Sequence, residues 1–206
     1  MSQEHYFSSD PDTEFKPREI QVELAGRALK LTTAGGVFSP EHLDQGTAVL
    51  LNHLDEVPPS GNLLDIGCGW GPIAIALAIT SPKSIVWAVD VNQRSLDLTA
   101  MNANRLGLTN IRVCKPEDVP KDIEFTGIWS NPPIRVGKAV LHEILQTWLP
   151  RLTAGGESYL VVQKNLGADS LQRWLESEFA TQGSVIRVDS AKGFRVLRVK
   201  RKLQGA

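Results

Sequence analysis

The sequence predicts an α/β fold in which a doubly wound, mostly parallel sheet carries helices on both faces. Two observations support this prediction. Short apolar runs alternate with segments of helical spacing from residue 61 onward, and the runs are continuously apolar, as in strands buried on both faces. A glycine-rich loop also joins the first apolar run to the first helical segment. Such alternation implies right-handed crossovers between parallel strands.

The 206 residues are enough for one domain with a full core and rather few for two. We therefore expect an N-terminal extension over residues 1–56 and the main domain over residues 57–206, together forming one structural unit. The formal net charge of −1 argues mildly against a protein that binds nucleic acid through its global charge. It leaves room for a local basic patch.

The N-terminal extension is expected to contain a hairpin and a helix that cover the ligand site of the main domain. Residues 20–24 and 28–31 alternate between apolar and polar side chains, with Gly26 between them, which is typical of a small hairpin. Residues 40–54 have helical spacing of apolar side chains, which predicts a helix there.

The main domain is expected to contain five buried strands, four helices and a C-terminal hairpin. The strands are predicted at residues 63–66, 85–89, 111–114, 127–129 and 159–162, and the helices at 72–80, 93–106, 138–149 and 169–179. The fifth strand is expected to begin only after Gly155 and Gly156. Residues 185–188 and 194–199, joined by a short turn, should form an antiparallel hairpin. The predicted sheet therefore has seven strands and a C-terminal antiparallel strand.

The strongest local signal is the sequence LDIGCGWGP at residues 64–72, which follows the first strand and opens the first helix. Glycines at Gly67, Gly69 and Gly71 allow a sharp turn and a close approach to a ligand. Their spacing differs from the dinucleotide fingerprint that holds a pyrophosphate. The carboxylate that begins the motif, Asp65, suits a ligand with a cationic head. A plain strand-to-helix turn and a nicotinamide site are the weaker alternatives.

Further candidates for the same ligand site lie at the ends of the next two strands. Asp90 ends the second strand, where an acidic residue can hold both ribose hydroxyls of an adenosine. Val91 follows it, and Cys68 lies within the glycine loop. Glu117, after the third strand, is a candidate acceptor for an adenine amine, and a solvated acidic turn is an equally open interpretation.

The fourth strand leads into Asn131, Pro132, Pro133 and Ile134, at the sheet edge where ligands bind in such folds. Two consecutive prolines stiffen this loop. The Asn131 side-chain oxygen and the Pro132 carbonyl then form two fixed neutral acceptors, which match the two N–H groups of an exocyclic amine on a base. We interpret residues 131–134 as a catalytic loop that positions and polarises an amine without a strong general base. A purely structural Pro-Pro turn is the alternative.

Several other side chains are candidates for lining the site or contacting a substrate. Phe38 is expected either to stack on a bound ring or to pack in the core, and Asp44 either to end a helix or to act as a site carboxylate. Arg135 and Lys138, together with six basic residues within residues 192–202, could follow a phosphate backbone. A charged edge strand is the alternative for the second group.

Composition also narrows the class of protein. Two cysteines and four histidines show no metal-ligand spacing, so we expect no metal. The N-terminus lacks the pattern of a signal peptide, and the longest apolar run, residues 73–79, is too short to span a bilayer. We therefore expect a cytoplasmic protein without a membrane partner.

The glycine loop and the Asn-Pro-Pro-Ile loop together resemble the class I S-adenosylmethionine (SAM)-dependent methyltransferases of the methyltransferase small domain group, which have a Rossmann-like fold. More narrowly, the chain is similar to RsmC-type 16S ribosomal RNA (guanine-N2-)-methyltransferases. This narrower likeness rests on residues 36–39, 43–47, 131–138 and 192–195. The likeness runs from about residue 5 to residue 201.

The resemblance implies S-adenosyl-L-methionine as the cofactor. The implied cofactor residues are Asp65, Gly67, Cys68, Gly69, Gly71, Asp90, Val91, Glu117 and Asn131. It also implies methyl transfer to the exocyclic amine of a flipped guanine in ribosomal RNA or the small ribosomal subunit. Methylation of another planar amine, such as adenine in RNA or DNA or a protein glutamine amide, is the alternative. Many base-amine methyltransferases have an aromatic residue where this chain has Ile134, so stacking on the base must come from elsewhere.

Overall fold

The structure, a computed structural model, describes residues 14–203, apart from the side chain of Arg135. Near the N-terminus, strands β1 (Arg18–Leu24) and β2 (Arg27–Thr33) pair as an antiparallel two-stranded sheet. Their turn consists of Ala25 and Gly26, which both have positive φ, as a two-residue hairpin turn of type I′ requires. The predicted hairpin is confirmed, with longer strands than expected.

Helix α1 (Gln45–Leu50) is shorter than the helix expected over residues 40–54, so that prediction is wrong at both ends. Ser39 has a φ of 46°, which an α-helix does not contain, and Asp44 caps the helix N-terminus. Downstream, the chain tightens into the 3-10 helix η2 (Leu51–Glu56), in which His53 departs from helical geometry.

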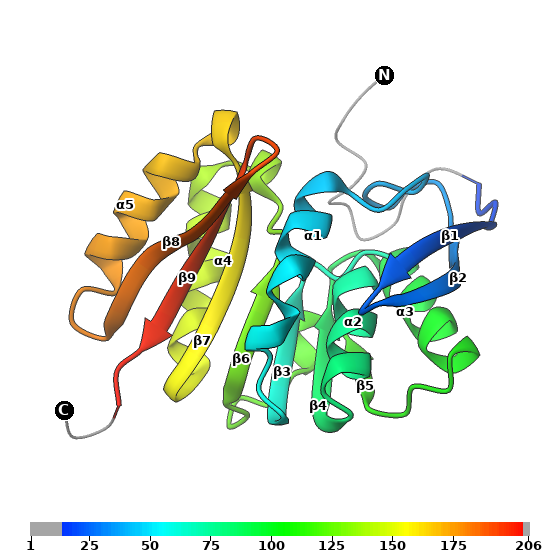
Figure 1. The fold of residues 1–206 in the computed structure, drawn as a ribbon, viewed down its shortest axis with the longest axis horizontal. Helices are drawn as coiled ribbons and strands as arrows, with labels where there is room; N and C mark the ends of the chain where they lie inside the picture. Colours follow the sequence, from blue (N-terminus) through cyan, green and yellow to red (C-terminus); the bar gives the residue numbers. More distant parts are fainter. Residues whose placement is uncertain (1–13, 204–206) are drawn as a thin grey trace.

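The main sheet has the order β5-β4-β3-β6-β7-β9-β8 (Figure 1). Its strands are β3 (Ser60–Ile66), β4 (Lys83–Val89), β5 (Ile111–Cys114), β6 (Phe125–Ser130), β7 (Leu152–Gln163), β8 (Gly183–Ala191) and β9 (Phe194–Arg201). The first five pair in parallel, and β9 is antiparallel to both of its neighbours. This confirms the predicted seven-stranded, mostly parallel sheet.

Strand β7 begins well before its predicted start, so Gly155 and Gly156 lie inside it. Gly155 has a φ of 76°, and a Cβ at Gly156 would lie 3.1 Å from the Phe125 carbonyl oxygen. The pairing between β6 and β7 shifts register in this region. The two glycines therefore allow an irregular, close pairing of strands, where the sequence suggested a break.

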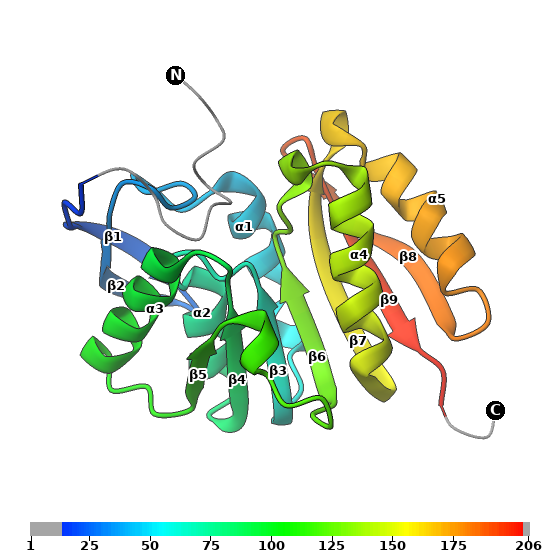
Figure 2. The ribbon, with the colours of Figure 1, turned by 180° about the vertical axis from the view of Figure 1, so that it is seen from behind.

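The helices of the main domain agree with prediction to within one residue at each end. They are α2 (Pro72–Thr80), α3 (Gln93–Arg105), α4 (Lys138–Trp148) and α5 (Ala168–Glu178). The 3-10 segments η3 (Pro116–Asp118), η4 (Ile134–Val136), η5 (Leu149–Arg151) and η6 (Lys164–Leu166) lie in the connections. The N-terminal hairpin, α1, α2 and α3 contribute to one core cluster, whereas α4 and α5 contribute to the other. In Figure 2, α4 lies in front of the sheet at β7 and α5 lies beside β8.

Successive residues of the central strands enter opposite cores, which is why these strands are continuously apolar. In β7, Tyr159 and Val161 belong to the first cluster, and Leu160 and Val162 to the second. Burying each such aliphatic side chain contributes roughly 1.5–3 kcal/mol. Packing on both faces fixes the carboxyl ends of β3, β4 and β6 at one edge of the sheet.

Candidate active site

The glycine-rich loop connects β3 to α2 and is held against β4. The N–H groups of Gly67 and Cys68 donate to the Val89 carbonyl at 2.8 and 3.0 Å. Gly67 and Gly69 have positive φ, and a Cβ added at either residue would meet no atom within 4 Å. The loop backbone therefore borders open space at these two residues, as expected where a ligand approaches the main chain.

The other side of the loop packs tightly on α3. A Cβ added at Gly71 would lie 3.0 Å from the Thr99 hydroxyl, and that hydroxyl donates to the Gly69 carbonyl at 2.9 Å. The Cys68 sulfur is buried 3.5 Å from the same hydroxyl. Burial raises the pKa of the Cys68 thiol, so this side chain is a neutral core group. Only the Cys68 backbone is available to line a ligand site.

Asp65 is fully buried at the end of β3 and has one unused oxygen. Its Oδ2 accepts a hydrogen bond from the Ala74 N–H in α2 at 2.9 Å, whereas its Oδ1 has no hydrogen-bond partner among the described residues. Burial raises the pKa of this carboxyl to about 8. A buried acceptor without a partner is costly, and a cation placed beside it removes that cost. This oxygen therefore fits the cationic amino-acid end of S-adenosylmethionine.

Asp90 fixes the glycine loop from the end of β4. Its Oδ2 accepts from the Gly69 N–H at 3.0 Å and its Oδ1 from the Asn92 N–H at 2.9 Å. Burial raises the pKa of Asp90, and the N–H groups of Asn92 and Gly69 oppose that rise. The Ser95 side chain and the Val91 N–H also lower this pKa, so Asp90 is a supported acceptor at the strand end where ribose hydroxyls are expected to bind.

The two remaining candidates on this side of the sheet are less enclosed. Val91, directly after Asp90, is 49% exposed and offers an apolar surface at the strand end. Glu117 lies in η3, directly after β5, and is also exposed. Their position at the ends of β4 and β5 allows contact with an adenine ring.

Residues 34–39, which we call the strap, connect β2 to the segment before α1. Three side chains donate to strap carbonyls: Arg94 to Gly35 (2.7 Å) and Asn92 to Gly36 (2.8 Å) from the start of α3, and Trp70 of the glycine-rich loop to Ser39 (3.2 Å). Within the strap, Phe38 is 51% exposed, so the core-packing alternative for this residue is wrong. Its ring is available to stack on a bound ring.

The loop after β6 begins with two anchored polar side chains. Ser130 donates to the Ile66 carbonyl at 2.7 Å, which ties the ends of β6 and β3 together. The Asn131 side-chain nitrogen donates to Asp44 Oδ2 at 2.8 Å and to the Thr47 hydroxyl at 3.0 Å. A carboxylate can only accept hydrogen bonds, so the nitrogen end of the amide must face Asp44. The carbonyl end, Asn131 Oδ1, therefore remains outside this network and can accept from a ligand.

Asp44 caps helix α1, which is the first of the two roles predicted for it, and it also binds Asn131. The same Oδ2 that accepts from Asn131 also accepts from the Thr47 N–H at 2.9 Å, which caps α1. The next residue but one, Gly46, leaves no room for a side chain, because a Cβ would lie 2.7 Å from the Phe194 ring. Helix α1 is thus fixed against β9 and against the loop that follows β6.

The proline pair forms a tight turn. Pro133 has φ −73° and ψ 75°, and the Ile134 N–H donates to the Pro132 carbonyl at 2.8 Å, which is an inverse γ-turn. The Pro132 carbonyl keeps a second lone pair for another donor. Ile134 packs against the core cluster of α4 and α5. It also borders a surface cavity together with Lys138, the exposed first residue of α4.

Among the predicted site residues, Arg135 has a side chain that lies outside the described part of the structure. Sequence reasoning assigns no functional role to Thr47, Ser130, Trp70, Asn92 or Arg94, all of which hold the site together. The positions of Asn92 and Arg94 directly after Asp90 are a usable signal. The sequence signal for Trp70 is limited to its place in the glycine-rich loop.

Two kinds of site are not found within residues 14–203. No group of three or more His, Cys, Asp or Glu side chains in this range is arranged to hold a metal ion. No helix in the same range is long and apolar enough to cross a membrane.

Comparison with known proteins identifies relatives over most of the chain. A family model described as "Methyltransferase small domain" matches residues 28–198. "Uncharacterized protein YbxB" of Bacillus subtilis (strain 168) is 33% identical over 201 residues, covering 96% of this chain and 98% of that protein. Ribosomal RNA small subunit methyltransferase C of Acinetobacter baumannii (strain AYE) is 33% identical over 185 residues, covering 85% of this chain and 52% of that protein.

Among solved structures, the RsmC 16S rRNA N2 guanine methyltransferase of T. thermophilus, in complex with AdoMet and guanosine, superimposes with a TM-score of 0.79. The identity is 22%, and the match covers 93% of this chain and 52% of that chain. This likeness shows the fold. The chain spans about half the length of these methyltransferase C relatives.

Proposed function

The chain belongs to the methyltransferase small domain family, and from this membership we propose that it methylates the exocyclic amine of guanine in ribosomal RNA. The enzyme class is that of the family: a methyltransferase with S-adenosyl-L-methionine as its cofactor. The names of the ribosomal RNA methyltransferase relatives support RNA as the acceptor. The match covers only about half of each of those relatives, so an RNA acceptor for this chain is proposed here and does not follow from the likeness alone.

The observation that carries this proposal is the fixed orientation of the Asn131 amide. Its nitrogen is bound to Asp44 and Thr47, so Oδ1 and the Pro132 carbonyl are two neutral acceptors on one stiff loop. A flipped amide would place Oδ1 against the Asp44 carboxylate, which is repulsive. Two such acceptors suit the two N–H groups of an exocyclic amine. Binding both hydrogens turns the nitrogen lone pair toward the methyl donor.

The proposed cofactor site lies across the ends of β3 and β4. When bound, S-adenosylmethionine supplies an electrophilic methyl group on a sulfonium. Asp65 Oδ1 accepts from the cationic amino-acid end, and Asp90 accepts from the ribose hydroxyls. The open backbone at Gly67 and Gly69 borders the ligand, and the exposed side chains at the ends of β4 and β5 contact the adenine. The N-terminal extension covers this site through the strap.

The acceptor base requires a stacking partner, because Ile134 packs into the α4–α5 core. We assign this role to Phe38, whose exposed ring lies on the strap. The same arrangement leaves positioning to Asn131 and Pro132 and stacking to a residue of the N-terminal extension.

The test uses pure protein, methyl-labelled S-adenosylmethionine, and ribosomal RNA or small subunits from a strain that lacks the gene. After digestion to nucleosides, we expect the label in N2-methylguanosine. Label in methyladenosine would keep the enzyme class and discard guanine. Absence of label in RNA, with the cofactor still bound, would discard the RNA acceptor and favour a protein amide. The Asn131→Ala protein is the matched negative control.

A further inference from the structure

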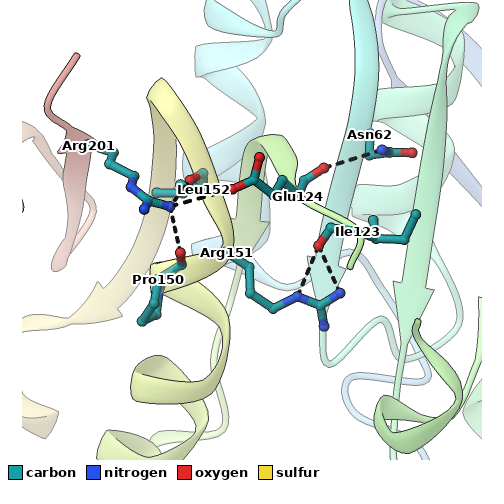
Figure 3. A network of polar contacts seen from close by, with 7 residues as sticks. All are labelled: Asn62, Ile123, Glu124, Pro150, Arg151, Leu152 and Arg201. Atoms are coloured by element: carbon teal, nitrogen blue, oxygen red, sulfur yellow. Dashed lines mark hydrogen bonds and ion pairs between the residues drawn. The ribbon is translucent and has the colours of Figure 1, made fainter. Parts of the chain in front are cut away.

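The basic residues near the C-terminus separate into two groups that the sequence does not distinguish. At the amino-end edge of the sheet, Lys200 and Arg198 lie 2.8 and 3.7 Å from Glu157. Arg201 donates to the Pro150 carbonyl at 2.6 Å and lies 4.0 Å from Glu124 (Figure 3). These cations are therefore paired with groups of the protein itself. The nearby Arg151 likewise donates to backbone carbonyls.

Two arginines of the β8–β9 hairpin nearer the catalytic loop are also paired. Arg195 and Arg187 both form ion pairs with Asp169 in the first turn of α5. Only 12% of the Arg195 side chain is exposed. This pairing holds α5 against the hairpin and leaves neither arginine available to bind a large anionic partner.

Three exposed lysines at the end of the sheet where Asn131 lies, in contrast, have no ion pair with any described residue. They are Lys138 at the start of α4, Lys164 at the start of η6, and Lys192 in the β8–β9 turn. We call these three residues the lysine rim. They come from three separate elements, so their grouping is a product of the fold.

Contacts of neighbouring residues connect the three segments that carry the lysine rim. Lys138 borders the same surface cavity as Gly167 and Leu166, and Leu166 ends the 3-10 turn that Lys164 begins. The Lys164 N–H donates to the carbonyl of Gly193, the residue after Lys192, at 2.8 Å. Ile134 of the catalytic loop forms another part of the cavity wall. The lysine rim therefore lies beside the loop that carries Asn131.

We propose that the lysine rim is the surface that binds the backbone phosphates of a single RNA strand while its target base reaches Asn131; this rests on the proposed function. Each ammonium neutralises a phosphate and releases a counterion, which gives affinity without sequence preference. The protein as a whole has a net charge of −1, so only such a local group can attract a polyanion.

The test compares two triple variants by fluorescence anisotropy with a labelled single-stranded RNA of mixed sequence. In the first, Lys138, Lys164 and Lys192 are changed to Gln. We expect its Kd for RNA to rise roughly 10- to 100-fold at low salt. We also expect the slope of log Kd against log salt to fall by about 2, since each single-strand phosphate contact contributes about 0.7.

The matched control removes the same charge at the opposite edge of the sheet. It combines Lys83→Gln, Lys121→Gln and Lys202→Gln, three exposed lysines for which no ion pair is found among residues 14–203. This control should retain the wild-type Kd and salt slope. Melting temperature and cofactor affinity, unchanged in both variants, would show that both are folded.

Wild-type RNA affinity and salt slope in the lysine-rim variant would overturn the inference. An equal loss of RNA affinity in both variants would also overturn it, since net charge alone would then explain binding. In methylation assays, the lysine-rim variant should show a higher KM for RNA and a nearly normal kcat. The lysine-rim variant could lose RNA binding while the wild-type protein transfers no label to RNA. That combination would support the lysine rim and reject the proposed acceptor.

Discussion

The two halves of the sheet hold their functional groups in different ways. On the β5-β4-β3 half, Asp65 and Asp90 are bound by backbone N–H groups of neighbouring turns, and the strap is joined to the same region. On the β6-β7-β9 half, Asn131 is held by side chains of a distant helix, beside a cavity and exposed lysines.

Under the proposed function, this difference suits two ligands of unequal size. A cofactor of fixed shape favours a rigid, preformed cage, whereas a macromolecular acceptor needs an open edge with a few fixed acceptors. Substitutions on the first half should therefore change cofactor affinity, and those on the second half should change turnover or RNA affinity. Single substitutions in each half test this separation.

The largest expected effect is that of Asn131→Ala. Loss of a fixed acceptor at the reacting amine should reduce kcat by roughly 10²–10³-fold, comparable with removal of one preorganised catalytic hydrogen bond. Calorimetric titration should give an unchanged Kd for S-adenosylmethionine. Near-normal turnover would reject the acceptor role, and an equal loss of cofactor affinity would mean that the two halves are not separable.

Asp90→Ala should produce the opposite pattern. Removing a charged acceptor for the ribose, and the anchor of the Gly69 N–H, should weaken cofactor binding by roughly 1–3 kcal/mol. The kcat at saturating cofactor should stay close to wild type. Asp97→Ala, an exposed carboxylate on α3, is the matched control, with wild-type affinity expected. An unchanged Kd for the Asp90 variant would show that the adenosine is held elsewhere.

Asp44→Ser separates the two roles of Asp44. Serine still caps α1, so the melting temperature should change little, but it does not supply the charged acceptor for Asn131. We expect kcat to fall roughly ten-fold through loss of one hydrogen bond to a charged group, with the Kd for the cofactor unchanged. Wild-type kcat in this variant would show that the Asn131 amide is oriented without Asp44.

The smallest expected effect is a dependence of cofactor affinity on pH. Burial raises the pKa of Asp65 from 3.8 to about 8, so the ligand-free folded protein holds a proton that the unfolded chain releases. Its contribution to stability is present below about pH 4 and is lost as pH rises toward about 8. A cationic ligand favours the ionised form, so cofactor affinity should increase a few-fold per pH unit up to about pH 8.

Calorimetric titration of wild type and Asp65→Asn over this pH range measures the effect. The asparagine amide in the variant does not ionise, so the variant should bind more weakly and show no rise in affinity with pH. A flat profile in the wild-type protein would show that Asp65 does not face the cationic end of the cofactor.

The sequence predicted the sheet and its helices well because their signals are local. Strand β5 and helix α2 have the predicted bounds, since the residue pattern that marks each of them lies within a short stretch of sequence. Helix α1 was misjudged, because its start depends on how Asp44 caps it and on the backbone at Ser39. Strand β7 was misjudged because its glycines serve a close contact with another strand.

The candidate site was predictable residue by residue but not in its connections. The glycine loop, Asp65, Asp90 and the Asn-Pro-Pro loop stand out as motifs. The orientation of Asn131 depends on Asp44 and Thr47, which are 87 and 84 positions away. Likewise, the basic stretch at residues 192–202 looks uniform until the fold shows which of its members have acidic partners.

The hydrogen bond between Asp44 and Asn131 also sets an order of events during synthesis. It closes a loop of 87 positions, and two strap contacts close overlapping loops of 56 and 59 positions, so the early segments wait for partners that emerge late. Closing such long loops costs entropy and slows folding. A nascent chain that ends after β5 already contains its entire glycine loop, but it has nothing to hold α1 at the catalytic edge. Because Asn131 directly follows β6, the hydrogen bond to Asp44 forms only after β6 has been synthesised.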